Sequence, residues 1–287
     1  MVQILKGYRH DAALRASFNA LAEKTFGLNF EGWYQNGFWG DNYNPYSVFM
    51  DGKIVANVSV NKTDMAVDGK RRRLYQLGTV MTDPDYRNRG YIRAIMEVVE
   101  RDIADGDGVY LFANDSVLDF YPKFGFVRGT EHVCEKDVCQ TGESIMECVV
   151  MDNPDAWARL RMAMEKSVVQ SACQMMDNPE LIFFYVSQFM QENVYYCAAL
   201  DAWAIAEIED GTLTLHHVFC PRKVSLDDVI AAFGGAVRRV VLGFTPLDTT
   251  GFTSRIHCEE DSTFFVRGEG FADFDMRRLR IPSLSHA

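Results

Sequence analysis

The chain has 287 residues, of which 48% are hydrophobic and 24% are charged, and its formal net charge is -11. This composition is typical of a globular protein with enough apolar residues for one large domain or two smaller ones. The negative charge argues against a nucleic-acid-binding protein that works by neutralising phosphates, and it fits a protein that attracts cationic ligands.

Neither the cysteines nor the apolar runs indicate a metal site or a membrane segment. The seven cysteines form no CxxC pair and have no HxxxH partner, so the sequence predicts no metal site, and their odd number disfavours a disulfide framework. No apolar run approaches the ~18 residues of a membrane-spanning helix, and the N-terminus lacks a signal-peptide pattern. These features predict a cytoplasmic protein with no membrane partner.

The first elements along the chain are a helix, an irregular aromatic segment and a hairpin. Residues 11–25 place Leu14, Phe18 and Leu21 at helical spacing. Residues 30–46, FEGWYQNGFWGDNYNPY, predict an irregular segment whose aromatic side chains either pack under a loop or line a substrate pocket. Residues 47–60, SVFMDGKIVANVSV, predict a hairpin that turns at Asp51-Gly52, and RRLYQLGTVMT at 72–82 continues as a strand.

A polar turn then separates this strand from a helix. The stretch VMTDPDYRNRGYIRAIMEVVE, residues 80–100, leaves its apolar run at Thr82 and resumes a helical pattern only after Gly90. The helix ends at DGDG, residues 105–108, and the apolar run VYLFA follows at 109–113. The unit is therefore a strand, a turn, a helix and a strand, which suits a crossover connection.

The second half repeats this pattern after two helices. Asn153-Pro154 and Asn178-Pro179 each predict a helix cap followed by proline at the first helical position. The aromatic helix ELIFFYVSQFM, residues 180–190, fits either the core or an oligomer contact. Residues 202–219 predict a hairpin that turns at Asp210-Gly211, residues 225–235 a helix, and residues 238–244 a strand.

The turn before the first crossover helix has the chemistry of an anion site. A helix N-terminus exposes unpaired amides with a partial positive charge, and Gly90 lets the backbone approach an anion closely. Arginine side chains surround the same point; they are Arg87, Arg89 and Arg93. The alternative is a solvated basic patch paired with Asp83 and Asp85. Neither a P-loop nor a dinucleotide fingerprint is present.

Two motifs resemble those of the GNAT superfamily of N-acetyltransferases. The stretch TDPDYRNRGYIRAIM resembles its coenzyme A pyrophosphate motif, which falls here on Arg87, Asn88, Arg89, Gly90, Tyr91 and Ile92. Ile92 departs from the motif, because the family has Gly or Ala at that position. The stretch ANDSVLDFYPKFGFVRG is similar to a downstream motif of the family, with matches at Asn114, Tyr121, Gly125 and Phe126.

The resemblance implies an α/β (α+β) fold in which a central mixed, mostly antiparallel sheet is flanked by helices. The bulky Ile92 followed by Arg93 resembles the enhanced-intracellular-survival acetyltransferases, which carry a second, degenerate GNAT-like domain. We therefore expect a catalytic domain at residues 1–145, and a helical bridge with the degenerate domain at 146–287. The second unit has no Arg-x-x-Gly before its helix and should not bind coenzyme A, and the chain is too short for the additional domain of the larger members.

The resemblance also assigns roles to residues. The pantetheine would lie along Val80, Met81 and Thr82, the pyrophosphate on Arg87 and the amides from Asn88 to Arg93, and Asn114 would contact the cofactor arm. Tyr121 would be the general acid, and the carboxylate of Ala287 would reach the site as the base, delivered by a C-terminal strand. Other candidate bases are Glu31, His132 and His286.

The sequence thus predicts an enzyme that transfers the acetyl group of acetyl-CoA to a primary amine of a small, cationic acceptor. Acetylation of a peptide or protein amine is an alternative within the same chemistry. A sensor that binds acyl-CoA without turnover is an alternative of another class. A homo-oligomer is left open.

Overall fold

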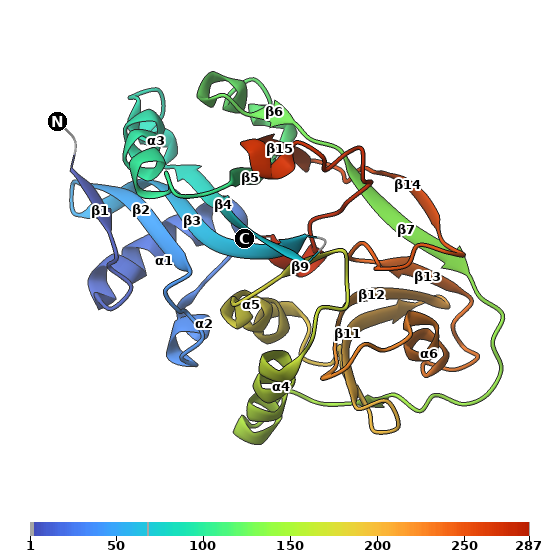
Figure 1. Ribbon diagram of the computed structural model, residues 1–287. Helices are drawn as coiled ribbons and strands as arrows, with labels where there is room; N and C mark the ends of the chain where they lie inside the picture. Colours follow the sequence, from blue (N-terminus) through green and yellow to red (C-terminus); the bar gives the residue numbers. More distant parts are fainter. Residues whose placement is uncertain (1–2, 68, 287) are drawn as a thin grey trace.

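The computed structural model describes residues 3–67 and 69–286, and its strands form two sheets (Figure 1). The first sheet contains β1 (Ile4–Lys6), β2 (Tyr43–Met50), β3 (Lys53–Val67), β4 (Lys70–Thr82), β5 (Gly108–Ala113), β15 (Thr263–Arg267) and β6 (Val127–Arg128), in that order. A further strand, β9 (Cys173–Met175), pairs with β3. Within the described chain only β4 and β5 pair in parallel in this sheet.

The second sheet repeats this arrangement. Its strands in order are β14 (Thr253–His257), β7 (Glu131–Asp137), β13 (Arg239–Leu242), β12 (Thr212–Phe219), β11 (Ala202–Glu209), β10 (Val194–Cys197) and β8 (Glu147–Cys148). Its one parallel pair among the described residues is β12 with β13. The predicted α/β class, with mixed and mostly antiparallel sheets in two similar units, is confirmed.

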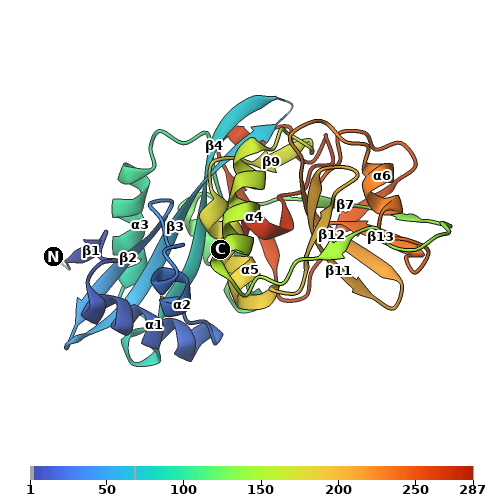
Figure 2. The same ribbon diagram turned by 90° about the horizontal axis from the view of Figure 1, so that it is seen from below.

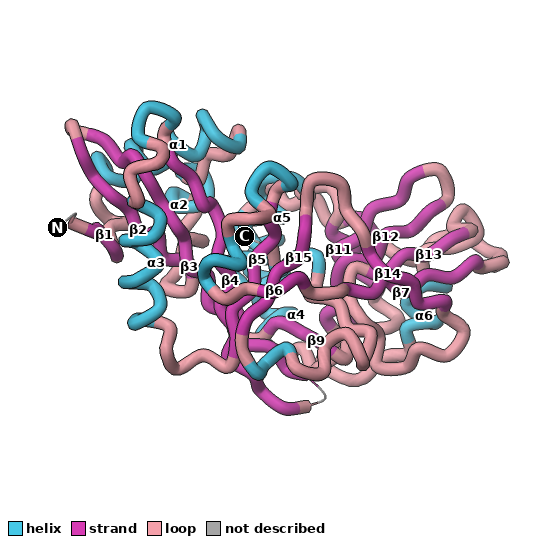
Figure 3. Tube along the Cα trace, turned by 90° about the horizontal axis from the view of Figure 1, so that it is seen from above, coloured by secondary structure: helices cyan, strands magenta, loops and turns pink. Residues whose placement is uncertain are grey.

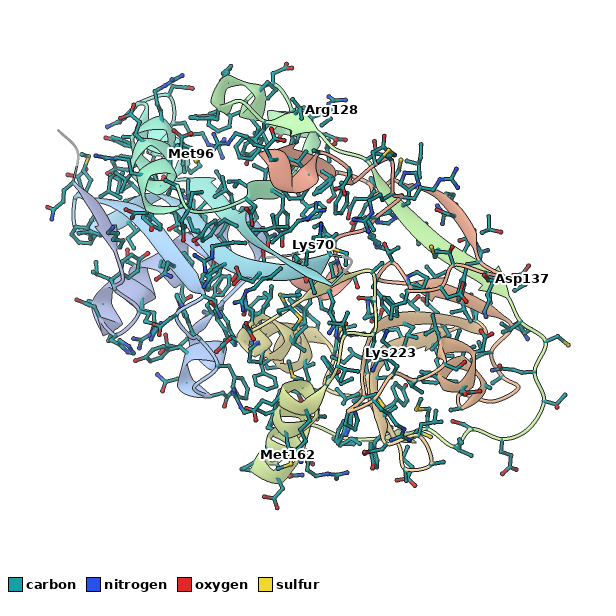
Figure 4. The ribbon with its side chains drawn as sticks, in the orientation of Figure 1. Lys70, Met96, Arg128, Asp137, Met162 and Lys223 are labelled. Carbon is teal, nitrogen blue, oxygen red and sulfur yellow. The ribbon has the colours of Figure 1, made fainter. Side chains whose placement is uncertain are left out.

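The two sheets exchange strands, because β9 and β15 of the second half join the first sheet and β7 of the first half joins the second sheet. Strand β15, from the C-terminal part of the chain, lies between β5 and β6 of the first sheet, whereas β7 lies beside β13 of the second. Figure 3 shows β15 and β6 leading from the first sheet toward β7 and β14. In Figure 4, Arg128 and Asp137 mark the stretch in which the chain crosses between the sheets. The division into residues 1–145 and 146–287 stays a prediction about domains, and the sheets themselves do not divide the chain there.

The helices begin close to where the sequence predicts, except for the short helix α2, which lies in the segment predicted to be irregular. They are α1 (Ala12–Phe26), α2 (Glu31–Gln35), α3 (Tyr91–Asp102), α4 (Pro154–Lys166), α5 (Pro179–Phe189) and α6 (Leu226–Ala231). The side chains of Asn153, Asn178 and Ser225 accept hydrogen bonds from the first turns of α4, α5 and α6, as expected for N-caps. Figures 1 and 2 both place α4 and α5 between the two sheets, so these helices join the two halves.

The aromatic segment at residues 30–46 contributes mainly to the core. It forms the short helix α2 and the start of β2, and the side chains of Phe30, Trp33, Phe38 and Trp39 are buried. The Trp33 indole N–H donates to the carbonyl of Glu180 at 2.9 Å, which ties α2 to α5. Of the two interpretations offered by the sequence, packing accounts for most of this segment.

The C-terminal segment is not the strand that the sequence predicts. Two of its backbone amides bond to side chains: that of Arg280 donates to the Thr245 hydroxyl at 2.8 Å and that of Ile281 to the Glu131 carboxylate at 2.8 Å. Pro282 has no amide to donate, and residues 283–285 form a single 3-10 turn. The segment nevertheless runs inward, because the Tyr185 hydroxyl donates to the carbonyl of His286 at 2.6 Å.

Buried Glu131 gives the fold a pH-dependent stability. Burial raises the pKa of this carboxyl from its ordinary 4.5 to about 7, with the Arg280 charge opposing the rise only in part. Between these values the folded state binds the extra proton, so stability falls as pH rises. We expect the free energy of unfolding of Glu131→Gln, relative to that of the wild type, to rise by about 3 kcal/mol between pH 4.5 and pH 7.5. Urea denaturation at each pH measures this difference.

The matched control is Glu135→Gln. Glu135 pairs with Arg239 at 2.9 Å, and its two arginine partners lower the pKa of its carboxyl. The ionised Glu135 carboxylate stabilises the fold at neutral pH, and this contribution is lost as pH falls. The free energy of unfolding of Glu135→Gln, relative to that of the wild type, should therefore fall as pH rises, which is the opposite of the change expected for Glu131→Gln. A difference between Glu131→Gln and wild type that does not change with pH would contradict the assignment.

Candidate active site

The two parallel strands of the first sheet separate next to a β-bulge. Strand β4 pairs with β5 only from Leu74 to Gln76. Beyond that point Thr79 and Val80 stand opposite the single residue Val58, and Thr79 adopts a left-handed φ of 42°. A bulge of this kind bends and twists its strand, so the end of β4 turns away from β5. The result is an opening at the carboxyl ends of both strands.

A buried polar network holds the bulge in place. The Asn57 amide donates to the carbonyl of Thr79 at 3.0 Å, and the Thr79 hydroxyl donates to Ser59 at 2.6 Å. The Tyr43 hydroxyl lies 2.8 Å from that of Thr79. On the other side of Asn57, the Ser47 hydroxyl donates to its amide oxygen at 2.7 Å. Because these groups are buried, each lost partner would leave a polar atom without water.

Asn57→Leu tests this network, because leucine keeps the volume but removes the polar atoms. We expect the variant to lose about 3 kcal/mol of stability in urea denaturation, since it removes the Asn57 donor to the Thr79 carbonyl and leaves the Ser47 hydroxyl with Tyr8 as its one remaining partner in the described chain. The control is Asn36→Leu at an exposed position after α2, which should change stability by less than about 0.5 kcal/mol. Equal effects at the two positions would show that the network does not hold the bulge.

A cavity of about 660 Å³ follows this opening to the start of α3. It is bounded by the end of α1, the end of β4, the polar turn and residues 114–124. Every residue that the sequence assigns to the cofactor lines it: Val80, Met81, Thr82, Arg87, Asn88, Arg89, Gly90, Tyr91, Ile92, Arg93 and Asn114. Tyr121 lines it as well. Their roles remain predictions, but the residues lie around one cavity.

The turn presents free backbone amides to this cavity. Gly90 is the N-cap of the 12-residue helix α3 and has a φ of 77°, and Asn88 has a φ of 62°. No side chain caps the helix, so its first amides have no acceptor within the helix or from a neighbouring side chain. The start of the helix therefore offers a group of backbone donors of the kind that binds anions.

The arginines of the turn are not paired with the aspartates beside them. Asp83 bonds instead with Lys53 at 2.8 Å, which lowers the pKa of its carboxyl. Within the described residues Arg87, Arg89 and Arg93 form no ion pair; the Arg89 guanidinium donates to the carbonyl of Asp85 and lies over the Tyr86 ring. The alternative of a basic patch paired with Asp83 and Asp85 is therefore wrong, because the arginines do not pair with these carboxylates. Their positive charge remains available to a ligand.

Tyr121 and Asn114 lie on the opposite side of the opening. The Tyr121 side chain is 6% exposed, burial raises the pKa of its phenol to about 12, and its hydroxyl makes no hydrogen bond within the described chain. The Asn114 amide donates to the carboxylate of Asp261 at 2.9 Å, so a residue of the second half orients it. A neutral phenol with no acceptor is suited to donating a proton.

A second cavity of about 280 Å³ adjoins the first. Both are lined by Phe26, Val80, Asn114 and Tyr121, so these residues mark the junction. On its far side the second cavity is lined by Phe184, Tyr185 and Phe189 of α5 and by His286. The sequence assigned the aromatics of α5 only to core or oligomer contacts, because no local signal relates α5 to β4. Both alternatives miss that α5 also forms a wall of this cavity.

His286 is the one candidate base among the described residues that lines either cavity. Its ring stacks on Phe112 with centroids 3.8 Å apart, and its Nε2 is buried without a partner among the described residues. Burial lowers the pKa of this imidazole to about 3, so it is neutral at physiological pH. Glu31 bonds with Arg15 at 2.8 Å and His132 with Asp275 at 3.0 Å, and neither lines the cavities. Ala287 lies outside the described residues.

Neither a metal centre nor a membrane span is found in the described part of the chain. Its residues contain no group of three or more His, Cys, Asp or Glu side chains that could hold a metal ion. They also contain no helix that is both long and apolar enough to cross a membrane.

Comparisons with known proteins give one domain match and a set of solved structures with a similar fold. Residues 14–129 match the model of an acetyltransferase (GNAT) domain. Among solved structures, a probable N-acyltransferase from Enterococcus faecalis V583 is 14% identical with a TM-score of 0.61, over 93% of this chain and 72% of that chain. A GCN5-related N-acetyltransferase from Kribbella flavida is 15% identical with a TM-score of 0.56, over 95% and 73%.

The structure of Eis1 from Mycobacterium abscessus is 11% identical with a TM-score of 0.54, over 92% of this chain and 73% of that chain. At these identities the likenesses show a shared fold, and they extend over both halves of the chain. No curated protein matches the sequence.

Proposed function

We propose that this chain, whose residues 14–129 match an acetyltransferase (GNAT) domain, transfers the acetyl group of acetyl-CoA to a primary amine of a small acceptor. Enzymes of this family are acyl-CoA-dependent N-acyltransferases. The observation that carries the proposal is the junction of two cavities at Tyr121, one ending at the free amides and arginines of the α3 start and one lined in part by aromatic side chains.

The residues of the larger cavity fit coenzyme A. The free amides at the start of α3 and the unpaired charge of Arg87, Arg89 and Arg93 suit a pyrophosphate. The edge of β4 from Val80 to Thr82 carries peptide groups that β5 does not pair, and these suit the amides of pantetheine. Acetyl-CoA, when bound, would supply the activated acetyl group as a thioester.

The reaction needs two proton transfers, and the residues at the junction suit them. The amine nitrogen forms a bond to the acetyl carbon while the carbon–sulfur bond breaks. The Tyr121 hydroxyl would donate its proton to the departing sulfur. The attacking nitrogen must lose a proton, and the carboxylate of Ala287 stays a predicted acceptor for it.

The size of the smaller cavity supports a small acceptor. A cavity of about 280 Å³ is at the lower end of the range for small-molecule sites, and it suits one side chain of a peptide better than an extended segment. Acetylation of a peptide or protein amine is therefore the second candidate. A sensor that binds acyl-CoA without turnover does not need a proton donor at the junction of the cavities. The buried Tyr121 hydroxyl therefore favours an enzyme.

The proposal is tested by measuring the free thiol released from acetyl-CoA in the presence of a panel of primary amines. We expect release that depends on an amine and a matching N-acetyl product by mass spectrometry. Tight binding of coenzyme A with no thiol release across small amines and lysine-containing peptides would contradict catalysis and favour the sensor.

A further inference from the structure

We propose that the acceptor is a primary amine carried on an apolar or aromatic body, bound in the cavity between β4, β5 and α5. This inference rests on the proposed function and specifies its substrate class. It differs from the cationic acceptor expected from the net charge, because overall charge says little about the lining of one cavity.

The lining of the smaller cavity is aromatic on several sides. Phe112 comes from β5, and Phe184, Tyr185 and Phe189 come from α5. Leu28 adds an apolar side chain after α1. A smaller apolar space of about 30 Å³ continues behind it between Leu28, Phe184 and the buried aromatics of residues 30–46. An apolar or aromatic group would therefore replace water at this surface with favourable contacts.

No carboxylate among the described residues lines this cavity. Glu259, whose charge raises the pKa of Tyr185, is exposed and lies outside the lining. A polyamine or an aminoglycoside would place a second ammonium group against this lining with no carboxylate of the described residues to pair with it, and the partial loss of its hydration is costly. The lining therefore selects against acceptors that carry more than one charge.

A further polar group beside this lining is the His286 imidazole. The Nε2 of His286 has no partner in the described chain, and its ring is fixed by stacking on Phe112. An apolar site also favours the neutral form of an amine over its ammonium form, and only the neutral form can attack a thioester. The same aromatic surroundings that bind the body of the acceptor would thus increase the share of reactive amine.

The test compares hexylamine with 1,6-diaminohexane, which differ only in a second amine at the far end of the chain. We measure thiol release from acetyl-CoA and expect kcat/KM to be at least about tenfold higher for hexylamine. 2-Phenylethylamine should behave like hexylamine, and spermidine like the diamine. A wild-type preference for the diamine or for spermidine would overturn the inference and leave the acetyltransferase reaction intact.

A matched pair of variants tests the cavity directly. Phe189→Glu places a carboxylate on the lining at a side chain that is 57% exposed, so the fold should tolerate it. Phe49→Glu makes the same change on β2, where the side chain is 42% exposed and lines neither cavity. We expect Phe189→Glu to shift the ratio of the two kcat/KM values toward the diamine by about tenfold, and Phe49→Glu to leave it unchanged.

A third variant addresses the polar atom. His286→Phe keeps an aromatic ring against Phe112 but removes the ring nitrogens, so kcat/KM for hexylamine should fall by about tenfold. Its Kd for coenzyme A should stay as in wild type.

An unchanged ratio of the two kcat/KM values in Phe189→Glu would place the acceptor elsewhere and overturn the inference. No thiol release with any amine would refute the proposed function itself, and this inference with it.

Discussion

Tyr121→Phe is expected to lower kcat for acetyl transfer by about 100-fold to 1000-fold, the size of effect that a positioned general acid usually has. The variant removes one hydroxyl from a buried ring that packs against Phe126 and Phe265, and it leaves those contacts in place. The hydroxyl has no hydrogen bond to lose in the described chain, so stability should hardly change. Steady-state thiol release and the Kd for acetyl-CoA by calorimetry are the two measurements.

The matched control is Tyr46→Phe. Tyr46 belongs to the same hydrophobic core as Tyr121, but its hydroxyl donates to Asp102 at 2.9 Å, and its ring lines neither cavity. It should therefore change stability more than kcat. Because burial holds the pKa of Tyr121 at about 12, the wild-type enzyme should also keep its acid protonated to pH 10. If Tyr121→Phe retained most of its kcat, another group or water would have to protonate the sulfur.

Gly90→Asp is expected to weaken coenzyme A binding by about 100-fold relative to Gly90→Asn, because only Asp adds a negative charge where the pyrophosphate would lie. Gly90 has a left-handed φ of 77°, and Asn and Asp are the residues that best tolerate this conformation after glycine. A Cβ atom at this position meets no other atom within 4 Å. Calorimetry with coenzyme A gives the two Kd values directly.

The two variants separate binding from folding. Both Asn and Asp are good N-caps, and Gly90 is the N-cap of α3, so neither side chain should disturb the helix. Asp also favours a helix N-terminus electrostatically, so its melting temperature should be at least that of the Asn variant. Equal Kd values for the two variants would show that no anionic group of the cofactor binds at this helix start.

Local patterns in the sequence determined most of the elements and the residues assigned to the cofactor. The turn from Asp83 to Gly90, the hairpin turn at Asp51-Gly52 and the caps at Asn153 and Asn178 each depend on residues a few positions apart. Their chemistry acts over the same short range, through hydrogen bonds to nearby amides and through φ preferences. For this reason the sequence alone is enough to name the residues assigned to the cofactor, and they line a single cavity.

The tertiary structure alone decided how the rest of the site is built. The bulge at Thr79 depends on Asn57 and Tyr43 across two neighbouring strands. The wall of the smaller cavity comes from α5 and His286, far from β4 in sequence. The exchange of β7 and β15, and the course of residues 277–286 outside any sheet, likewise depend on partners from the other half of the chain. Such contacts leave no periodic trace in the sequence, because each is a single pairing that only the assembled fold brings together.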